Sequence, residues 1–162
     1  MKFSVNQQDL QKSLGYCQGV IEKRSTLPIL SNILLDASNS KLTLTATDLD
    51  LIFIHKINNV EVIEEGKTTT TSSIMYDIIR KFPSGKKINF SLSNNNKLQL
   101  ESEKSIFHLN CINTSEFPLT DENFIQNEFV IKSKQLLKLL NKCKFSISND
   151  ETRHYLSGIF FE

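Results

Sequence analysis

The sequence predicts an α+β fold built from two copies of one unit, in which a strand, a helix and three further strands follow one another. Three observations support this prediction. Short runs of alternating apolar and polar residues are typical of strands with one buried face. Two other segments repeat apolar residues every three or four positions, as amphipathic helices do. The opening of the chain also recurs 126 positions later, where Phe3 falls on Phe129.

The first half of the unit begins with a strand at residues 2–5, followed by a helix. Asn6 is a suitable N-cap, because its side chain can accept a hydrogen bond from the first helical turn. Apolar residues at helical spacing predict one buried stripe, formed by Leu10, Leu14, Cys17 and Ile21. Three strands of an antiparallel meander are then expected at residues 30–37, 41–48 and 51–62.

The second half of the unit repeats this order. Four consecutive threonines, which are β-branched, predict a strand at residues 66–71. A helix at residues 74–82 is expected to end before Pro83, because proline cannot continue a helix. Three more alternating strands are expected at residues 88–92, 98–100 and 106–112. The doubled unit would form two small antiparallel sheets, with both helices packed against the same side.

The internal repeat sets the predicted domain boundaries. Ten residues are identical over roughly 35 ungapped positions, including Leu30 with Leu156, which is difficult to reach by chance. We therefore predict a complete first domain at residues 1–125 and the start of a second at residues 126–162, with the order strand, helix, strand. No partner strands follow the last predicted strand, residues 155–161, so we expect the chain to be a fragment of a longer protein.

Charge is unevenly distributed along the chain. Twelve Lys or Arg and only three Asp or Glu lie in the three predicted helices and their flanks, at residues 6–24, 72–87 and 132–144. Lysines fill the solvated face of many amphipathic helices, so one basic helix alone indicates little. Three helical segments with the same sign favour a polyanionic partner.

Other features of the sequence indicate a cytoplasmic protein without a membrane partner. No apolar run is long enough to span a bilayer, and the N-terminus lacks the apolar core of a secretion signal. The cysteines lack metal-ligand spacing, and buried thiols in a reducing cytoplasm are the favoured interpretation for Cys17, Cys111 and Cys143.

Asp48 and Asp50, with His55 nearby, are the best candidates for an acid–base or metal site. They also lie where a hairpin needs turn residues, and that interpretation is favoured. A metal-dependent hydrolase is therefore a weak hypothesis, and no cofactor is expected. A stronger alternative to nucleic-acid binding is an isolated protein-interaction or assembly module whose basic helices are only solvated.

Four motifs together resemble the bacterial DNA polymerase III beta subunit family, the replicative sliding clamps. In order, they are RSTLPILSNILL at residues 24–35, TLTATDLDL at 43–51, SEFP at 115–118 and ETRHYLSGIFFE at 151–162. The resemblance covers the whole chain. It implies the DNA-clamp fold and a processivity factor of DNA polymerase III that performs no catalysis itself. In this family, helices line a hole around duplex DNA.

The resemblance also implies partners. Full-length chains of the family form a head-to-tail homodimeric ring, which the polymerase III catalytic subunit and the clamp loader bind. For this chain, the family's head-to-tail edge corresponds to Ile106, Phe107 and Leu109. Because the sequence contains no third domain, we expect weak, salt-dependent DNA binding without ring closure.

Individual residues are assigned by the same resemblance. Arg24 matches a DNA-contacting arginine of the family, and His154 and Tyr155 match a pair that touches the single-stranded template of primed DNA. Leu156 matches one wall of a pocket that takes partner peptides. Further basic residues taken as DNA-binding candidates are Lys23, Arg80, Lys132 and Lys138.

Overall fold

A computed structural model of the 162-residue chain describes residues 1–21, 27–93, 95–118, 129–148, 150 and 152–161. The chain forms two compact units, Met1–Leu119 and Thr120–Glu162. We describe each unit by itself.

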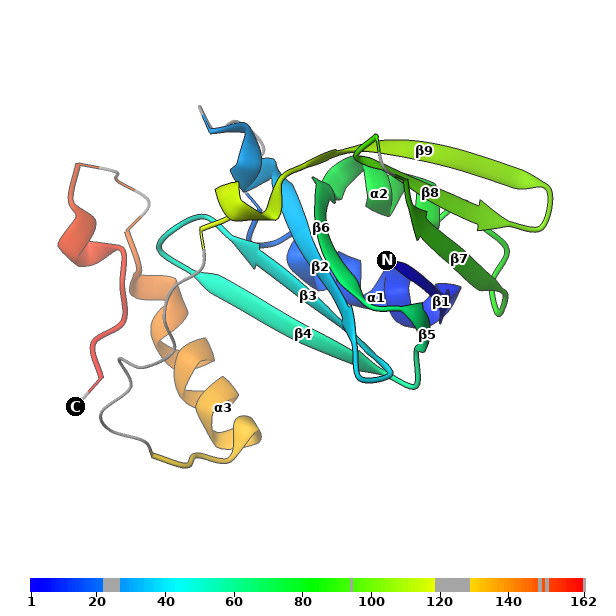
Figure 1. Cartoon of the computed structure of the whole chain (residues 1–162). Coiled ribbons are helices and arrows are strands. Elements are labelled where there is room, and N and C mark those ends of the chain that lie inside the picture. The colour runs from blue at the N-terminus through cyan, green and yellow to red at the C-terminus, as the bar shows by residue number, and fades with distance from the viewer. Residues whose placement is uncertain (22–26, 94, 119–128, 149, 151, 162) are drawn as a thin grey trace. The chain divides into compact units, whose positions relative to one another are not determined.

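The first unit has the doubled order predicted from the sequence (Figure 1). Its first half comprises β1 (Lys2–Asn6), α1 (Gln7–Cys17), the 3-10 helix η1 (Pro28–Ser31), β2 (Asn32–Ser38), β3 (Lys41–Thr47) and β4 (Ile52–Asn58). A short strand, β5 (Glu61–Glu64), follows. The second half comprises β6 (Gly66–Thr71), α2 (Ser72–Ile79), β7 (Lys87–Leu92), β8 (Lys97–Ser102), β9 (Ser105–Ile112) and the 3-10 helix η2 (Thr114–Glu116).

Helix α1 begins and packs as the sequence predicts. The Asn6 side chain accepts a hydrogen bond from the backbone N–H of Gln8 at 2.9 Å, which confirms the N-cap. All four residues of the predicted apolar stripe are buried. The helix nevertheless ends at Cys17, and Gly19 closes a tighter turn by donating its N–H to the carbonyl of Tyr16. Glycine disfavours helix continuation, so Ile21 is buried from a turn rather than from the helix.

The described residues form one nine-stranded antiparallel sheet in the order β4-β3-β2-β6-β9-β8-β7-β1-β5. The two sheets predicted from the sequence are the halves of this sheet. A short ladder between β6 and β9 joins them through the pairs Thr69–Ile112 and Thr70–Cys111. Elsewhere β9 pairs only with β8, so residues 105–110 have one unpaired edge among the described residues.

The predicted strand at residues 51–62 is wrong in its length, because the structure divides it into β4 and β5. Between these strands Asn59 adopts a φ of 60°, in the left-handed region that Asn tolerates better than most residues. β5 then leaves the meander and pairs with β1 in the other half of the sheet, where Val62 lies opposite Phe3. This crossing ties the two halves together.

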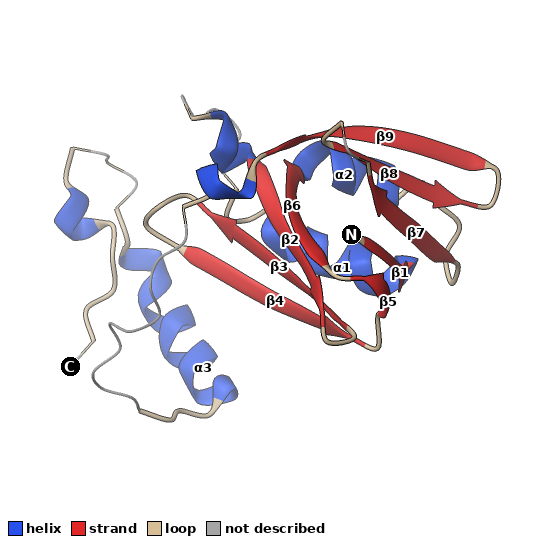
Figure 2. Ribbon diagram, viewed as in Figure 1, coloured by secondary structure: helices blue, strands red, loops and turns tan. Residues whose placement is uncertain are grey.

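The core of the first unit lies between the sheet and the two helices, α1 and α2, which cover the same face (Figures 1 and 2). Phe3 and Phe90 stack within it, with ring centroids 4.6 Å apart. Leu34 faces the opposite way, because it alternates along β2 with the core residues Ile33 and Leu35. It is buried on that second face, as is Phe117 from the predicted linker.

The second unit contains α3 (Ser133–Cys143), which confirms the predicted helix, followed by 3-10 turns at Lys144–Ser146 and His154–Leu156. The strands predicted on either side of this helix, beginning at residue 128 and covering 155–161, are not formed by the described residues. A strand needs a hydrogen-bonded neighbour, and the described part of this unit offers none. None of the described helices of the chain is long and apolar enough to cross a bilayer.

Candidate nucleic-acid interface

The helices of the first unit present a polar groove. α1 and α2 pack closely, because a Cβ added at Gly15 would lie only 3.8 Å from the Tyr76 ring. A groove of about 590 Å³ between them is lined by glutamines, a serine, Lys12 and the rings of Tyr16 and Tyr76. None of these residues was among the predicted site residues, although Gln8, Lys12 and Tyr16 recur every four positions along the exposed face of the helix.

An aromatic cluster borders this groove where α1 meets β4. The His55 ring lies parallel to the Phe53 ring at 6.2 Å, and the Tyr16 ring approaches His55 edge-on at 5.8 Å. Lys12 and Lys56 line the adjacent cavity of about 300 Å³. Tyr16 is the exposed ring of this cluster, and Phe53 and His55 are half-buried. An exposed ring beside lysines can stack on a base while ammonium groups meet phosphates.

The positive charge counted around α2 is largely cancelled in the structure. Arg80 Nε lies 3.3 Å from Asp77, Lys86 Nζ lies 3.2 Å from Glu103 and Lys87 Nζ lies 3.0 Å from Glu61. All three pairs are exposed, so each contributes little stability, but each lowers the net field of its lysine or arginine. Arg80, the DNA-binding candidate in this segment, is therefore exposed, but its charge is already paired with Asp77.

Two DNA-binding candidates of the first unit, Lys23 and Arg24, lie outside the described residues. They belong to the segment between the buried Ile21 and Leu27, which precedes η1.

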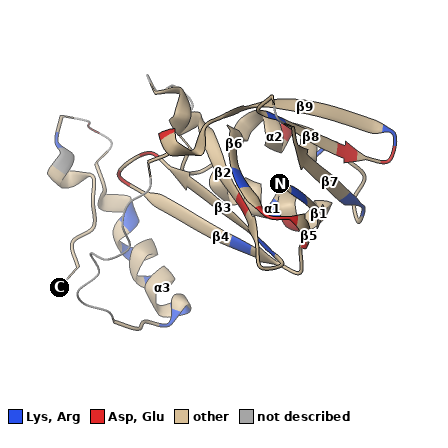
Figure 3. Ribbon diagram, viewed as in Figure 1, with Lys and Arg blue, Asp and Glu red and all other residues tan. Residues whose placement is uncertain are grey.

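Helix α3 carries the strongest unpaired positive charge of the described residues (Figure 3). Lys134, Lys138 and Lys142 recur every four positions, which places their Cβ atoms in a row along one face of the helix, with roughly 6 Å between neighbours. We call these three residues the α3 lysine row. Leu136 and Leu140 lie on the opposite face and are partly buried.

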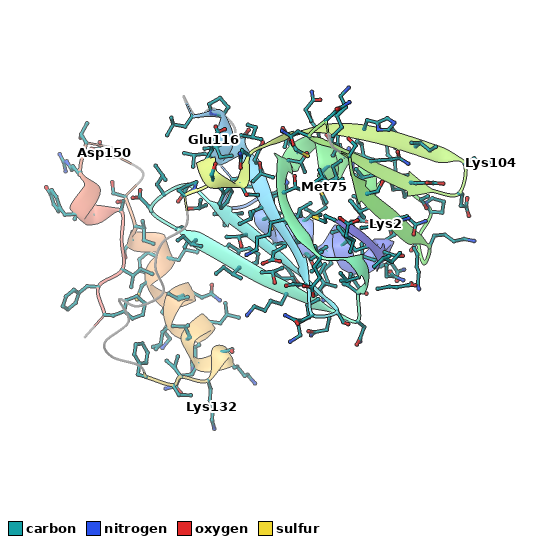
Figure 4. The ribbon with its side chains drawn as sticks, viewed as in Figure 1. Lys2, Met75, Lys104, Glu116, Lys132 and Asp150 are labelled. Carbon is teal, nitrogen blue, oxygen red and sulfur yellow. The ribbon has the colours of Figure 1, made fainter. Side chains whose placement is uncertain are left out.

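Lys132 stands at the N-cap of α3 and makes no capping hydrogen bond there (Figure 4). A cation at a helix N-terminus opposes the helix dipole at a cost of about 0.3 to 1 kcal/mol. The position is therefore unfavourable for the helix itself and leaves the charge available to an anion. Together with Lys144 at the other end, it extends the basic surface of α3.

The template-contact candidates lie in the exposed turn at His154–Leu156. The Tyr155 side chain is 82% exposed, whereas the side chain of His154 is not among those described. Asp150 lies in the same segment, and a 2.6 Å hydrogen bond from the Thr152 hydroxyl holds the pKa of its carboxyl below the usual value. Asp150 also pairs with Arg153 at 3.5 Å, which reduces the charge that Arg153 can offer to phosphate. Leu156, the candidate pocket residue, is partly exposed.

The predicted dimer edge on β9 is exposed at two of its three residues. Ile106 and Phe107 are exposed on the unpaired stretch of β9, and Phe107 packs edge-on against Phe82 at 5.6 Å. Leu109 is only 7% exposed and belongs to the core, opposite Leu98 of β8. An edge contact at Leu109 would therefore be made by its backbone, and its place in the dimer edge stays a prediction.

Asp48, a candidate for the alternative acid–base or metal site, has a structural role in a turn. Asp48 Oδ1 accepts hydrogen bonds from the backbone N–H groups of Asp50 at 3.1 Å and Leu51 at 2.7 Å. Asp48 therefore shapes the turn between β3 and β4, which confirms its interpretation as a turn residue.

The three thiols are free, but their surroundings differ. Burial raises the pKa of Cys17 to about 12 and also raises the pKa of Cys111. Cys143 is exposed, so the expectation that it would be buried like Cys17 is wrong. The equivalent helix α3 has no described sheet to cover it.

Comparison with known proteins points in one direction. A family described as "DNA polymerase III beta subunit, N-terminal domain" matches residues 1–121. The beta sliding clamp of Caulobacter vibrioides is 34% identical over 161 residues, which cover 99% of this chain and 43% of that protein. The beta sliding clamp of Escherichia coli K12 is 33% identical over 162 residues, covering 100% of this chain and 44% of that protein.

Solved structures give the same similarity. A sliding clamp from Bartonella birtlesii, bound to griselimycin, is 36% identical and has a TM-score of 0.95 over 100% of this chain and 43% of that one. A Caulobacter crescentus pol III beta structure has a TM-score of 0.91 at 34% identity, covering 98% of this chain and 42% of that one. The chain thus spans less than half the length of the relatives it matches.

Proposed function

The chain belongs to the DNA polymerase III beta subunit family, and from this membership we propose that it contributes to a sliding clamp that keeps the replicative polymerase on DNA. The observation that carries the proposal is the combination of a family fold with an unpaired lysine row on α3. The chain would act without catalysing a reaction. Its place of action would be the cytoplasm.

We further propose that the contacts with duplex DNA are made to phosphates. Lysines that meet phosphates bind any sequence and release counterions, so a protein held in this way can move along the duplex. The candidates are those already named: Lys23, Arg24, Arg80, Lys132 and Lys138. Tyr155, with His154, would stack on bases of single-stranded template in primed DNA.

Protein partners belong to the same proposal. The unpaired edge of β9 can accept a strand from a second subunit, which supports a homodimer edge at Ile106, Phe107 and Leu109, with Leu109 contributing its backbone. Leu156 would form part of a peptide site for the polymerase III catalytic subunit or the clamp loader. The boundary between domains at residues 125 and 126 is likewise proposed.

Fluorescence anisotropy with a labelled duplex tests the proposal. At low salt the wild-type chain should bind, and Lys138→Ala together with Arg24→Ala should weaken binding by about tenfold or more, since each phosphate contact contributes to affinity. Lys104→Ala, at the tip of the β8–β9 hairpin (Figure 4), is the matched control and should bind as the wild type does. Absence of binding at about 10 mM salt, where electrostatic attraction to phosphates is strongest, would reject DNA contact.

A further inference from the structure

An apolar groove of about 490 Å³ opens on the first unit, beside η1 and the turn between β3 and β4. Its walls include Leu27, Pro28, Leu49, Ile112 and Pro118. Every described residue that lines it lies within Met1–Leu119, whereas Leu156 belongs to the second unit. Its volume lies in the range of about 300 to 1,000 Å³ that is typical of ligand sites.

Leu49 forms one wall of the groove and has a backbone conformation that is unfavourable for leucine. Its φ is 84°, in the left-handed region that favours glycine, and its side chain is 56% exposed. Leu27, across the same groove, is 50% exposed. A leucine at this turn therefore contributes little to the stability of the fold, because its backbone is strained and its side chain is not buried.

The turn that carries Leu49 is held firmly. The Leu49 N–H donates to the Thr47 hydroxyl at 3.0 Å, and the Asp48 carboxylate accepts from Leu51 N–H at 2.7 Å. Thr47 is itself buried in β3. The groove wall is thus fixed before any ligand arrives, which lowers the entropy lost on binding.

One carboxylate lines this groove, that of Glu116, which Figure 4 labels. Two more, Asp48 and Asp50, flank the wall residue Leu49 in the chain. None of the three makes an ion pair with another residue of the described ranges. Negative charge beside an apolar floor attracts a ligand whose apolar side chains are flanked by cations.

We propose that this groove binds a short extended peptide segment of a partner protein, with one or two bulky apolar side chains flanked by lysine or arginine. The apolar side chains fill the space between Leu27 and Leu49, and the flanking cations meet the carboxylates. Leu49 is then a specificity-determining wall residue rather than a folding residue.

The probe is a fluorescein-labelled hexapeptide with two central leucines and two lysines on each side, compared with the same peptide carrying glutamates instead of lysines. Anisotropy should show that the lysine peptide binds the wild-type chain about tenfold or more tightly than the glutamate peptide. Leu49→Gly should weaken the lysine peptide by about tenfold, as expected for loss of a central apolar contact. Glu116→Lys should also weaken it.

Two controls separate binding from folding. Leu51→Ser removes a neighbouring leucine that is equally exposed but does not line the groove, and it should leave peptide affinity unchanged. The urea midpoint of Leu49→Gly should not fall, because glycine relieves the strain at a positive φ.

Several results would overturn the proposal. They are equal binding of the two peptides, no binding of either, wild-type affinity in Leu49→Gly, or an equal loss in Leu51→Ser. Sedimentation that shows self-association of the wild-type chain, abolished by Leu49→Gly, would assign the groove to a second copy of the chain instead.

Discussion

Individual cysteines of this chain differ in reactivity for reasons visible around each sulfur. The thiolate is the reactive form, and burial that raises the pKa of Cys17 to about 12 keeps that thiol protonated at pH 8. Cys143 is exposed on α3. With the thiol reagent DTNB at pH 8, we expect Cys143 to react first and Cys17 to react only when the protein unfolds in urea.

Cys143→Ser provides the control for this titration, since it should remove the fast phase and nothing else. A fast phase that persists in this variant would show that Cys17 or the half-buried Cys111 is accessible to the reagent.

Two glycines of the first unit should respond to alanine in opposite ways. A Cβ at Gly66 would lie 2.8 Å from the Met1 Cβ, closer than unbonded carbons approach, so Gly66→Ala should destabilise the fold by about 1 to 3 kcal/mol. At Gly15 the nearest atom is 3.8 Å away, and the site is helical, so Gly15→Ala should stabilise by up to about 1 kcal/mol. Urea unfolding followed by circular dichroism measures both, and effects of equal sign would contradict the packing described.

At the scale of elements, the halves of the sheet depend on the short β6–β9 ladder. The Thr69 hydroxyl donates to the carbonyl of Ile112 at 2.8 Å and accepts from the side-chain amide of Asn32 at 3.2 Å. Thr69→Val removes both bonds in a buried site and should cost about 1 to 3 kcal/mol. Thr43→Val, on the partly exposed part of β3, is the control and should change stability by less than about 0.5 kcal/mol. Similar losses of stability in the two variants would show that the Thr69 hydrogen bonds at the β6–β9 ladder contribute no more than an ordinary threonine hydroxyl.

Most elements of the first unit were predictable because their signals are local. Apolar spacing along α1, the Asn6 cap and the threonines of β6 each specify their own segment. The division at Asn59 was not predictable, since β5 is defined by its pairing with β1, far away in the sequence. The burial of Leu109 does not follow from alternation alone, because the four residues before it on β9 are all exposed, including Phe107 on the same face.

The candidate site was predicted less completely for a related reason. Counting charge along the chain identified basic segments, but the carboxylates that cancel them come from other elements, as Glu61 does for Lys87. Three of the four basic residues in and after α2 are paired, whereas α3 keeps its lysines unpaired among the described residues. The charge count therefore overestimated the free positive charge around α2.

At the scale of the whole molecule, equivalent positions of the repeat should differ in their contribution to stability. Leu10 is completely buried, and Leu10→Ala should cost about 2 to 5 kcal/mol. Leu136, its counterpart on α3, is only partly buried, and Leu136→Ala should cost less than about 1 kcal/mol. Equal losses in urea unfolding would mean that the second unit has a packed core of its own.

The salt dependence of DNA affinity tests the central claim most directly. For a duplex bound through phosphates, log K falls linearly with log salt, and each lost phosphate contact reduces the slope by about 0.9. Replacing all three residues of the α3 lysine row by alanine should therefore reduce the slope by about 2 to 3, equally for two duplexes of unrelated sequence. A slope unchanged from that of the wild-type chain would contradict the assignment of α3 as a phosphate-binding surface.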